Sequence, residues 1–377
     1  MISQITAVFR MLFQLQRVLV KYYVVMVILS TITYADVLKA SENSGTNAVV
    51  VRPGYDYAAA LMNESESNKI WWCGNLPGFS GDQILYLDNL DDQTHYTSSD
   101  ERIKNVFSPS GNKDRFDSEH TCDPSVIRVD GHYYMYYSGI DVLKKRILKL
   151  PNPTAIGVAV SMDGLHWTRE NDGVPIVKAV STTEGKRNTY GAGQPAVVFV
   201  SPYYYMLFTD TTAPIAGSNI GANLFVIRSR DPLFSTFEEL LKEGFMPTTN
   251  GEIKRNYRVV DGFTAEMVFI EEWNLFMVAV NREPGATWLY FFNRDFQPVS
   301  DRVSVENQWS EGPGILRDEL GHIRPASNGM VTLTIISPVG DRKKPQTWDL
   351  YSTVVELERI EEPLTIKIIP GASIKKQ

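Results

Sequence analysis

Cysteine and histidine are scarce in this chain, whose 377 residues include two cysteines and five histidines. Their spacing fits no zinc-binding loop, because such loops bring their ligands together over short intervals of sequence. The sequence therefore gives no support for a zinc site, and we expect the protein to work without a metal or another cofactor.

Clusters of basic residues are also missing. The formal net charge is −7, and the first 35 residues carry three positive charges and no acid, so the remainder carries −10. Within that acidic remainder the basic runs are short, as at 342–344. A chain of this kind is poorly suited to bind a polyanion, so we expect no nucleic-acid partner.

Hydrophobic runs long enough to cross a bilayer are not evident either. The apolar run Tyr22–Tyr34 has 13 residues, follows Lys21 and precedes the small residue Ala35. These features predict a secretory signal peptide over 1–35 and a secreted or periplasmic location. Two other interpretations stay open: an uncleaved anchor, which would bring the protein to a membrane, and a buried N-terminal helix.

What the sequence does contain is a repeat. Residues 123–139, DPSVIRVDGHYYMYYSG, read as two strands joined by an Asp130-Gly131 turn. The same design begins again at Gln194 and Glu266, after 71 and 72 residues. Fifteen residues after each leading residue stands a small polar side chain. These side chains are Ser138, Thr209 and Asn281.

Two weaker copies, led by Asp56 and Glu311, bring the number of units to five. A period near 70 residues, with three or four antiparallel strands per unit, predicts an all-β, five-bladed β-propeller. We expect a linker over 36–48, the propeller over 49–362 and a C-terminal tail over 363–377, with residues at either end available to complete a blade. The one expected helix covers 237–243, FEELLKE.

The leading residues are the predicted functional centre. In a propeller the first strand of each blade lines the central channel, so equivalent positions converge at one mouth. Crowded carboxylates raise one another's pKa, and glycosidic cleavage needs a protonated carboxyl beside an ionised one. The ring consists of Asp56, Asp123, Gln194, Glu266 and Glu311.

The motifs DPSVIRVDGHYYMYYSG, IGVAVSMDGLHW and SEGPGI resemble those of the five-bladed propeller glycosidases of glycoside hydrolase family 43 and its relatives in families 32, 68 and 117. The resemblance covers about residues 49–358. It implies that Asp123, in an Asp-Pro motif, is the base, that Gln194 stands at the position of a tuning Asp, and that Glu266 is the general acid.

A second alignment starts from Asp56. It makes Asp123 the tuning residue and places Gln194 at the acid, a role that an amide cannot serve, so we prefer the first alignment. Glu311, in an EGP context that resembles the acid motif of the family, is the rival acid. The glutamine departs from the family pattern and allows a propeller that binds sugar without cleaving it.

Four further residues are candidates for substrate binding. Arg282 and Asp210 end the second strands of their units, where they reach the mouth or form an ion pair between blades. Trp72 is a stacking platform or a core residue, and His120 lines the site or belongs to a solvated loop. The long polar connection 88–121 precedes Asp123 directly, which favours a role in walling a pocket.

The repeat also bears on the two cysteines. Cys73 ends the second strand of the first unit, and Cys122 precedes the first strand of the next, so both fall at the same rim of adjacent sheets. In an exported protein such a pair often forms a disulfide, although two separate buried thiols fit the sequence as well.

Three functions follow from these patterns. The first is an exported glycoside hydrolase with a carbohydrate substrate, and the second is a non-catalytic carbohydrate-binding propeller. The third, a protein-interaction propeller, has no need of the convergent acids. We therefore expect the hydrolase, with the binding propeller as the alternative.

Overall fold

The computed structural model describes residues 47–51, 56–65, 67–75, 81–90, 101–141, 154–180, 190–216, 223–248, 251–283, 286–306, 311–340, 344, 348–361 and 364–368. The expected signal peptide and most of the expected linker lie outside these ranges. Within them, no helix has the length and apolar character needed to cross a membrane.

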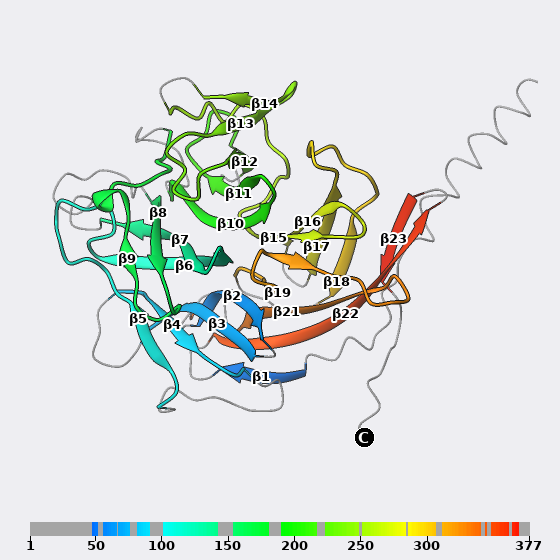
Figure 1. Ribbon diagram of the computed structural model, residues 1–377, viewed down its shortest axis with the longest axis horizontal. Coiled ribbons are helices and arrows are strands. Elements are labelled where there is room, and N and C mark those ends of the chain that lie inside the picture. Colours follow the sequence, from blue (N-terminus) through cyan, green and yellow to red (C-terminus); the bar gives the residue numbers. More distant parts are fainter. Residues whose placement is uncertain are drawn as a thin grey trace, which may run out of the picture. The chain divides into compact units, whose positions relative to one another are not determined.

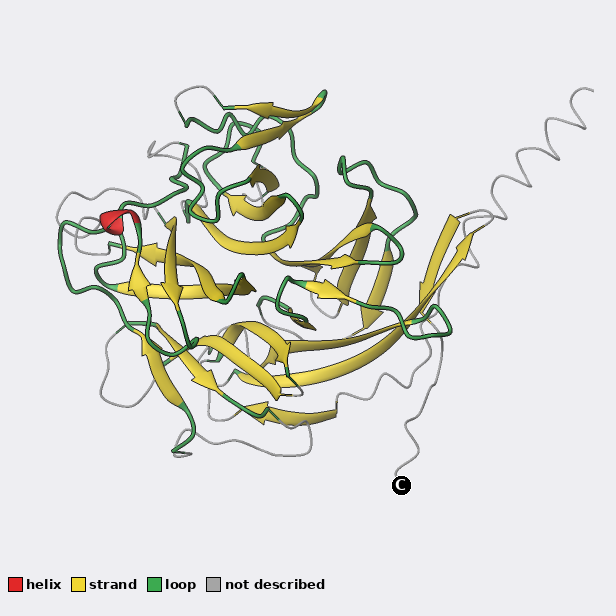
Figure 2. Cartoon of the chain, in the orientation of Figure 1, coloured by secondary structure: helices red, strands yellow, loops and turns green. Residues whose placement is uncertain are grey.

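The described chain is all-β, with one short 3₁₀ turn at Asn171–Gly173 (Figures 1 and 2). Its strands form five blades in chain order around a common axis (Figure 1). Blade I contains β2 (Tyr57–Glu64), β3 (Ser67–Gly74), β4 (Gln83–Leu87) and β5 (Lys104–Phe107). Blade II contains β6 (His120–Val129), β7 (His132–Ile140), β8 (Ala155–Ser161) and β9 (Thr168–Arg169).

The next two blades repeat this antiparallel order. Blade III contains β10 (Ala192–Val200), β11 (Tyr203–Asp210), β12 (Leu224–Ser229), β13 (Glu238–Leu241) and β14 (Gly244–Pro247). Blade IV contains β15 (Thr264–Ile270), β16 (Leu275–Glu283), β17 (Ala286–Phe292) and β18 (Val303–Glu306), with the short β20 (His322–Ile323) added parallel to β15.

Blade V closes the ring with strands from both ends of the described chain. It contains β19 (Gly314–Arg317), β21 (Val331–Val339), β22 (Asp349–Glu361), β1 (Asn47–Val51) and β23 (Leu364–Ile368). The first half of β22 pairs with β1 and the second half pairs with β23. Blades I and V also join directly, because β2 and β19 pair in parallel at Leu61–Leu316 and Met62–Arg317.

The hydrophobic core lies between blades. Five large clusters of buried side chains each join two neighbouring blades, so that every interface of the ring has one. Alternate residues of a strand point to opposite faces, and both faces of each inner strand are covered. This explains why Val197 packs toward blade II while Val198, the next residue, packs toward blade IV.

The expected helix at 237–243 is wrong. Residues Glu238–Leu241 form β13, which pairs with β12 on one side and with β14 on the other. Glutamate and leucine favour helices, but a segment of this length is too short to form a stable helix by itself. The edge of β12 offers it backbone hydrogen bonds as a strand instead. Leu240 is buried in the cluster between blades III and IV.

Cys73 and Cys122 form a disulfide, with their Cα atoms 4.9 Å apart. Cys73 lies on β3 and Cys122 on β6, so the bond joins blades I and II at the end of the inner strands where the leading residues stand. Closing a loop of 49 residues in the unfolded chain is worth about 4 kcal/mol in the chain-entropy account. The bond thus restrains the residue that precedes Asp123.

The opposite end of the inner strands is covered by the turn 318–321, between β19 and β20. The carbonyl groups of its residues accept hydrogen bonds from the backbone N–H groups of β6, β10 and β15. The donor and acceptor pairs are Arg128 to Glu319 at 2.6 Å, Phe199 to Leu320 at 2.9 Å and Phe269 to Gly321 at 3.1 Å.

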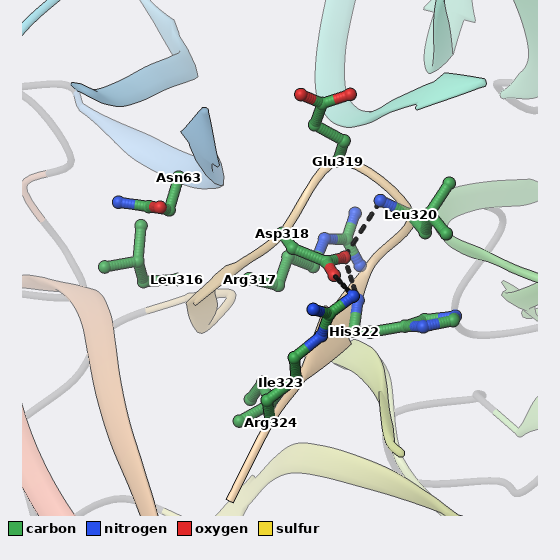
Figure 3. A pocket seen from close by; sticks show the side chains of 9 residues that line it. All are labelled: Asn63, Leu316, Arg317, Asp318, Glu319, Leu320, His322, Ile323 and Arg324. Atoms are coloured by element: carbon green, nitrogen blue, oxygen red, sulfur yellow. Dashed lines mark hydrogen bonds and ion pairs between the residues drawn. The ribbon is translucent and has the colours of Figure 1, made fainter. Parts of the chain in front are cut away.

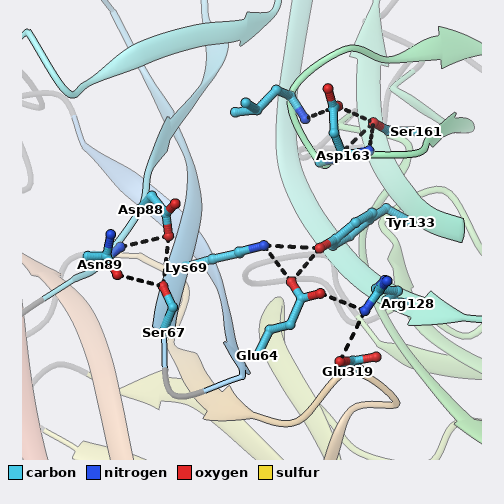
Figure 4. A network of polar contacts seen from close by, with 12 residues as sticks. Glu64, Ser67, Lys69, Asp88, Asn89, Arg128, Tyr133, Ser161, Asp163 and Glu319 are labelled. Atoms are coloured by element: carbon cyan, nitrogen blue, oxygen red, sulfur yellow. Dashed lines mark hydrogen bonds and ion pairs between the residues drawn. The ribbon is translucent and has the colours of Figure 1, made fainter. Parts of the chain in front are cut away.

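A polar network ties this turn to blades I and II (Figure 4). Glu64 accepts hydrogen bonds from Lys69, from the hydroxyl of Tyr133 and from Arg128, the last at 2.6 Å. Arg128 also reaches Glu319 of the turn at 3.3 Å. Burial alone would raise the pKa of Glu64, but the hydrogen bonds from Lys69 and Tyr133 outweigh it and lower that pKa.

Candidate active site

The inner strands of blades II and III begin with the same backbone irregularity. Asp123 and Gln194 have φ angles of 50° and 52°, and the register of each first hairpin shifts at that point. Each residue is followed by a proline, which has no N–H to donate to the ladder and therefore favours a bulge there. The bulge sets the two side chains at equivalent places on neighbouring blades.

The other leading residues are not at this position. In blade I the register assigns the bulge to Ala58, and in blade V the left-handed residue before a proline is Gly312. Asp56 stands two residues before Ala58, and Glu311 stands one residue before Gly312. Glu266 lies in a β15 that pairs regularly with β16 throughout. The five leading residues therefore do not form one ring of equivalent positions.

Asp123 is buried, with 7% of its surface exposed. Its Oδ2 accepts a hydrogen bond of 2.8 Å from the hydroxyl of Tyr190, and its Oδ1 has no partner in the described part of the chain. Burial raises the pKa of this carboxyl, while the hydrogen bonds from Ser138 and Tyr190 oppose the rise. Because Oδ1 is buried without a donor, it is the atom through which the carboxyl can meet a substrate hydroxyl or a water.

Gln194 connects Asp123 to Glu311. The backbone N–H of Gln194 donates to Ser138 Oγ at 2.8 Å, and the Tyr190 hydroxyl lies 3.4 Å from the same oxygen. The Gln194 side chain donates from Nε2 to Glu311 Oε1 at 3.2 Å. These contacts join five polar residues into one connected group. Four of them belong to blades II, III and V, and Tyr190 lies on the segment between blades II and III. Three of the five are predicted ring residues. We call this group, Asp123, Ser138, Tyr190, Gln194 and Glu311, the mouth network.

Asp56 lies in a separate environment at the same end of blade I. Its Oδ1 accepts a 2.7 Å hydrogen bond from the indole of Trp72, and its Oδ2 has no partner in the described residues. Burial, with a smaller contribution from the charge of Asp349, raises the pKa of Asp56 to about 7. This carboxyl therefore carries its proton over much of the acidic range.

Replacing Asp56 with asparagine is expected to stabilise the fold, and more at pH 8 than at pH 4.5. The pKa of Asp56 is about 7 in the fold, against 3.8 for an ordinary aspartate, so the folded state retains a proton that the unfolded state has lost. Stability is therefore lost as the pH rises from about 4 to 7, by up to about 4 kcal/mol. Urea unfolding of both forms at the two pH values measures this difference. The same gain at both values, or in the exposed control Asp130→Asn, would contradict it.

Glu266 points to a different partner. Its Oε1 accepts a 2.8 Å hydrogen bond from Arg317, which is fully buried and also reaches the Met267 carbonyl and Ser125 Oγ. Burial raises the pKa of Glu266, and the charge of Arg317 together with the Met267 N–H opposes this rise. The ion pair crosses from blade V to blade IV and also holds blade II, so Glu266 is part of the inner structure of the channel.

His120 lies near Asp123, and its imidazole is paired with another carboxylate. Its Nδ1 is 3.0 Å from Oδ2 of Asp82, which is buried and also accepts hydrogen bonds from Tyr57 and Asn75. The charge of His120 acts on Asp123 to lower its pKa, and that of Asp82 acts to raise it. His120 thus borders the mouth network as part of a polar wall.

The remaining predicted contacts with substrate lie elsewhere. Asp210 is fully buried and is satisfied by Arg255, at 2.8 Å, and by Thr212. Trp72 is fully buried too, so its indole supports Asp56 and presents no open face. The side chain of Arg282 lies outside the described residues. From 101 onward, the connection 88–121 is described and includes β5 as the outer strand of blade I.

A cavity of about 660 Å³ opens at the far end of the inner strands, beside the turn 318–321 (Figure 3). Its polar residues are engaged in contacts within the protein. Asp318 accepts backbone hydrogen bonds from Leu320 and His322, and His322 lies 2.8 Å from Glu271 and 2.7 Å from the Phe199 carbonyl.

Two groups of three potential metal ligands occur in the described part of the chain. In the first, Cys73 and Cys122 are joined to each other beside Asp82, so their sulfur atoms are not free thiolates. In the second, beside the cavity, Arg324 already pairs with the carboxylate of Glu271 at 3.0 Å. Both groups are held by protein contacts.

Sequence reasoning missed Tyr190, Asp82 and Arg317. None of them belongs to a repeated position: Tyr190 precedes β10, Asp82 precedes β4 and Arg317 ends β19. The one available signal was Ser138, whose small polar type recurs in three units and whose hydroxyl receives the N–H of Gln194. Nothing local in the sequence marks the tyrosine as a neighbour of Asp123.

The architecture is shared with solved enzymes. A thermostable family-43 glycoside hydrolase superposes with a TM-score of 0.51 and 11% sequence identity, over 87% of this chain and 96% of that chain. The fold is that of the propeller glycoside hydrolases. The five-bladed propeller predicted from the repeat is confirmed, and the resemblance read from the motifs is confirmed at the level of fold.

Two further structures extend the comparison. A family 117 glycoside hydrolase from the marine bacterium Zobellia galactanivorans matches with a TM-score of 0.49 and 11% identity, over 84% of this chain and 86% of that chain. The catalytic domain of a family 62 α-L-arabinofuranosidase from Coprinopsis cinerea matches with a TM-score of 0.48 and 9% identity, over 82% and 95%. No protein-family model and no curated protein matches the sequence.

Proposed function

We propose that the protein is an exported glycoside hydrolase that cleaves a poly- or oligosaccharide at the mouth network. The observation that carries this proposal is the chain of polar contacts from Asp123 through Tyr190, Ser138 and Gln194 to Glu311, which places two carboxyl groups in one connected network. Export is supported by the N-terminal sequence and by the disulfide, which is typical of oxidising compartments.

In this proposal the two carboxyl groups have different tasks. Asp123, which accepts a hydrogen bond from Tyr190, acts in its ionised form on the anomeric side. Glu311 gives a proton to the leaving oxygen as the glycosidic bond breaks. The oxygen of a water molecule bonds to the anomeric carbon, and a proton of that water replaces the one that the acid gave up.

Glu311 is preferred to Glu266 as the acid. The carboxylate of Glu266 is occupied by the buried Arg317, which favours its ionised form, whereas the neighbour of Glu311 in the mouth network is the neutral amide of Gln194. Gln194 of blade III has no acidic proton to donate, so in this proposal Glu311 of blade V is the general acid. Asp56, whose carboxyl holds a proton to near neutrality, adds a second donor at the same rim.

The atoms that remain unpaired fit a carbohydrate. Asp123 Oδ1 and Gln194 Oε1 are buried acceptors with no donor in the described part of the chain, and Asp56 Oδ2 has no partner there either. Sugar hydroxyl groups are donors, and each can satisfy one such oxygen without bringing a charge into the site. This set of acceptors supports a carbohydrate substrate.

The first experiment is a hydrolysis screen of the protein lacking residues 1–35. Its substrates are aryl arabinofuranosides, xylosides and galactosides, together with fructans, neutral polysaccharides and polymers that contain uronates. Release of sugar from at least one substrate by the wild type and loss of that release in Asp123→Asn are the expected results. Because the exposed turn residue Asp130 lies outside the mouth network, Asp130→Asn is the matched control and is expected to remain active.

A non-catalytic carbohydrate-binding propeller is the second candidate, favoured by one observation. Gln194 places an amide at the bulge where Asp123 of the preceding blade has a carboxyl. No release across the panel, combined with binding of a glycan by calorimetry, would support this candidate and contradict the hydrolase. Binding should then weaken in Gln194→Ala. The variant loses the Nε2 group that donates to Glu311 and the unpaired Oε1 that a sugar hydroxyl can bind.

A further inference from the structure

Tyr190 is the residue of the mouth network that no repeat predicts. It stands two residues before β10, on the segment that leads into blade III. Its hydroxyl donates to Asp123 Oδ2 at 2.8 Å, and its ring packs edge-on against Phe263 with the centroids 5.0 Å apart. The phenol is therefore held from two sides, by an aromatic ring and by a carboxylate.

The neighbouring Gly193 makes room for this arrangement. A Cβ atom at Gly193 would lie 2.6 Å from the Tyr190 hydroxyl oxygen and 2.8 Å from Ser138 Oγ. Both distances are shorter than real Cβ contacts, so any larger residue would displace the phenol or the serine. A side chain at position 193 would therefore crowd the hydroxyl that Tyr190 directs at Asp123.

The proton in this hydrogen bond belongs to Tyr190. Burial and the neighbouring charge of Asp123 raise the pKa of the phenol well above its ordinary value, so it remains a donor over the range in which enzymes work. A hydrogen bond donated to a carboxylate favours the ionised carboxylate. Two other titratable groups face Asp123, His120 and Asp82, and neither is bonded to Tyr190 in the contacts described above.

We propose that Tyr190 is a positioning residue: its hydroxyl holds the Asp123 carboxylate in one orientation and in its ionised form, with Oδ1 directed to the reaction. This inference rests on the proposed function, which makes Asp123 the ionised partner. Tyr190 acts on the reaction through Asp123, because Oδ2 is the oxygen that it occupies and Oδ1 is the one that has no partner in the described residues.

The first test is the pH profile of Tyr190→Phe, which removes the hydroxyl and keeps the ring. The acidic limb of kcat/KM is expected to move up by about one pH unit, because a tenfold change in the protonation equilibrium of Asp123 corresponds to one unit. The plateau is expected to fall several-fold as the carboxylate loses its fixed orientation. The matched control is Tyr136→Phe. Tyr136 lies on the same blade as Asp123, and its buried hydroxyl donates a hydrogen bond to the Pro232 carbonyl.

A second variant reaches the same contact without removing the hydroxyl. Gly193→Ala pushes the phenol away from Asp123 and is expected to move the acidic limb in the same direction as Tyr190→Phe. A purely structural role of Tyr190 would lower the melting temperature and leave the limb of the folded enzyme in place. Limbs that coincide in the wild type, Tyr190→Phe and Tyr136→Phe would overturn the proposal.

A direct titration separates this proposal from the proposed function. The carboxyl carbon of Asp123 is observed by ¹³C NMR and is assigned by its loss in Asp123→Asn. A higher midpoint in Tyr190→Phe than in the wild type supports the hydrogen bond even if the wild type hydrolyses no glycoside in the screen. An unchanged midpoint overturns the role of Tyr190, whatever the screen shows.

Discussion

Glu311→Gln is expected to lower kcat by about 10³-fold on a substrate with a poor leaving group, which is the usual range for the loss of a general acid. The physical reason is that an alkoxide leaves only slowly without a proton, and the neighbouring Gln194 has no acidic proton to give. Asp123→Asn is expected to lose a comparable factor, because an amide cannot act as a base or a nucleophile at the anomeric carbon.

The leaving group separates these two roles. The dinitrophenolate group of a dinitrophenyl glycoside leaves without being protonated. On that substrate Glu311→Gln should therefore recover most of its rate, while Asp123→Asn should not. Steady-state kinetics on a series of aryl glycosides of different leaving-group pKa provide the measurement. The control is Glu243→Gln, an exposed glutamate in the turn between β13 and β14, which is expected to behave as the wild type.

The same series includes Glu266→Gln as the rival. If that variant, corrected for its folded fraction, shows the leaving-group dependence of an acid mutant and Glu311→Gln does not, the assignment of the acid to Glu311 is wrong. If neither glutamate affects the rate, Asp56 becomes the remaining protonated carboxyl at the mouth, and Asp56→Asn should show the dependence instead.

Arg317→Met is expected to destabilise the fold by about 3–5 kcal/mol at neutral pH, the range found when one partner of a buried ion pair is removed. Arg317 is fully buried, and its guanidinium satisfies Glu266, the Met267 carbonyl and Ser125 at once. Methionine fills a similar space but leaves the carboxylate of Glu266 buried and unpaired.

The pH dependence of this loss has a definite sign. Burial already raises the pKa of Glu266, and removal of Arg317 takes away the charge that opposes the rise. The unpaired carboxyl can take up a proton at low pH and cannot at high pH, so the loss should be smaller at pH 5 than at pH 8. Urea unfolding of both proteins at the two pH values gives the comparison.

Two further variants complete this experiment. Arg324→Met removes a mostly exposed arginine from the same part of the chain, where an ion pair with Glu271 is worth at most about 1 kcal/mol. The double variant Arg317→Met/Glu266→Leu removes both buried charges and is expected to recover much of the stability. Equal losses in Arg317→Met and Arg324→Met would show that the buried pair does not hold the channel together.

The fold was predictable because its unit is local. Each copy of the repeat contains its own strand alternation and its own turn, as in Asp130-Gly131, and these depend on residues a few positions apart. The proximity of Cys73 and Cys122 followed in the same way from their places in adjacent units. The helix expected at 237–243 shows the opposite case, because local preference there is overruled by the open edge of β12.

The sequence alone determined the number of blades, their order and the presence of Asp123, Gln194 and Glu311 near one mouth. Only the tertiary structure decided which of them meet. Closure of the ring brings Glu311 of blade V to Gln194 of blade III across 117 residues, and it brings Tyr190 to Asp123 across 67. In blades I and V the left-handed residue is Ala58 or Gly312, so Asp56 and Glu311 do not stand at the position of Asp123 and Gln194. Glu266 is paired with Arg317 instead. Such pairings depend on distances across the propeller axis, which no local pattern in the chain encodes.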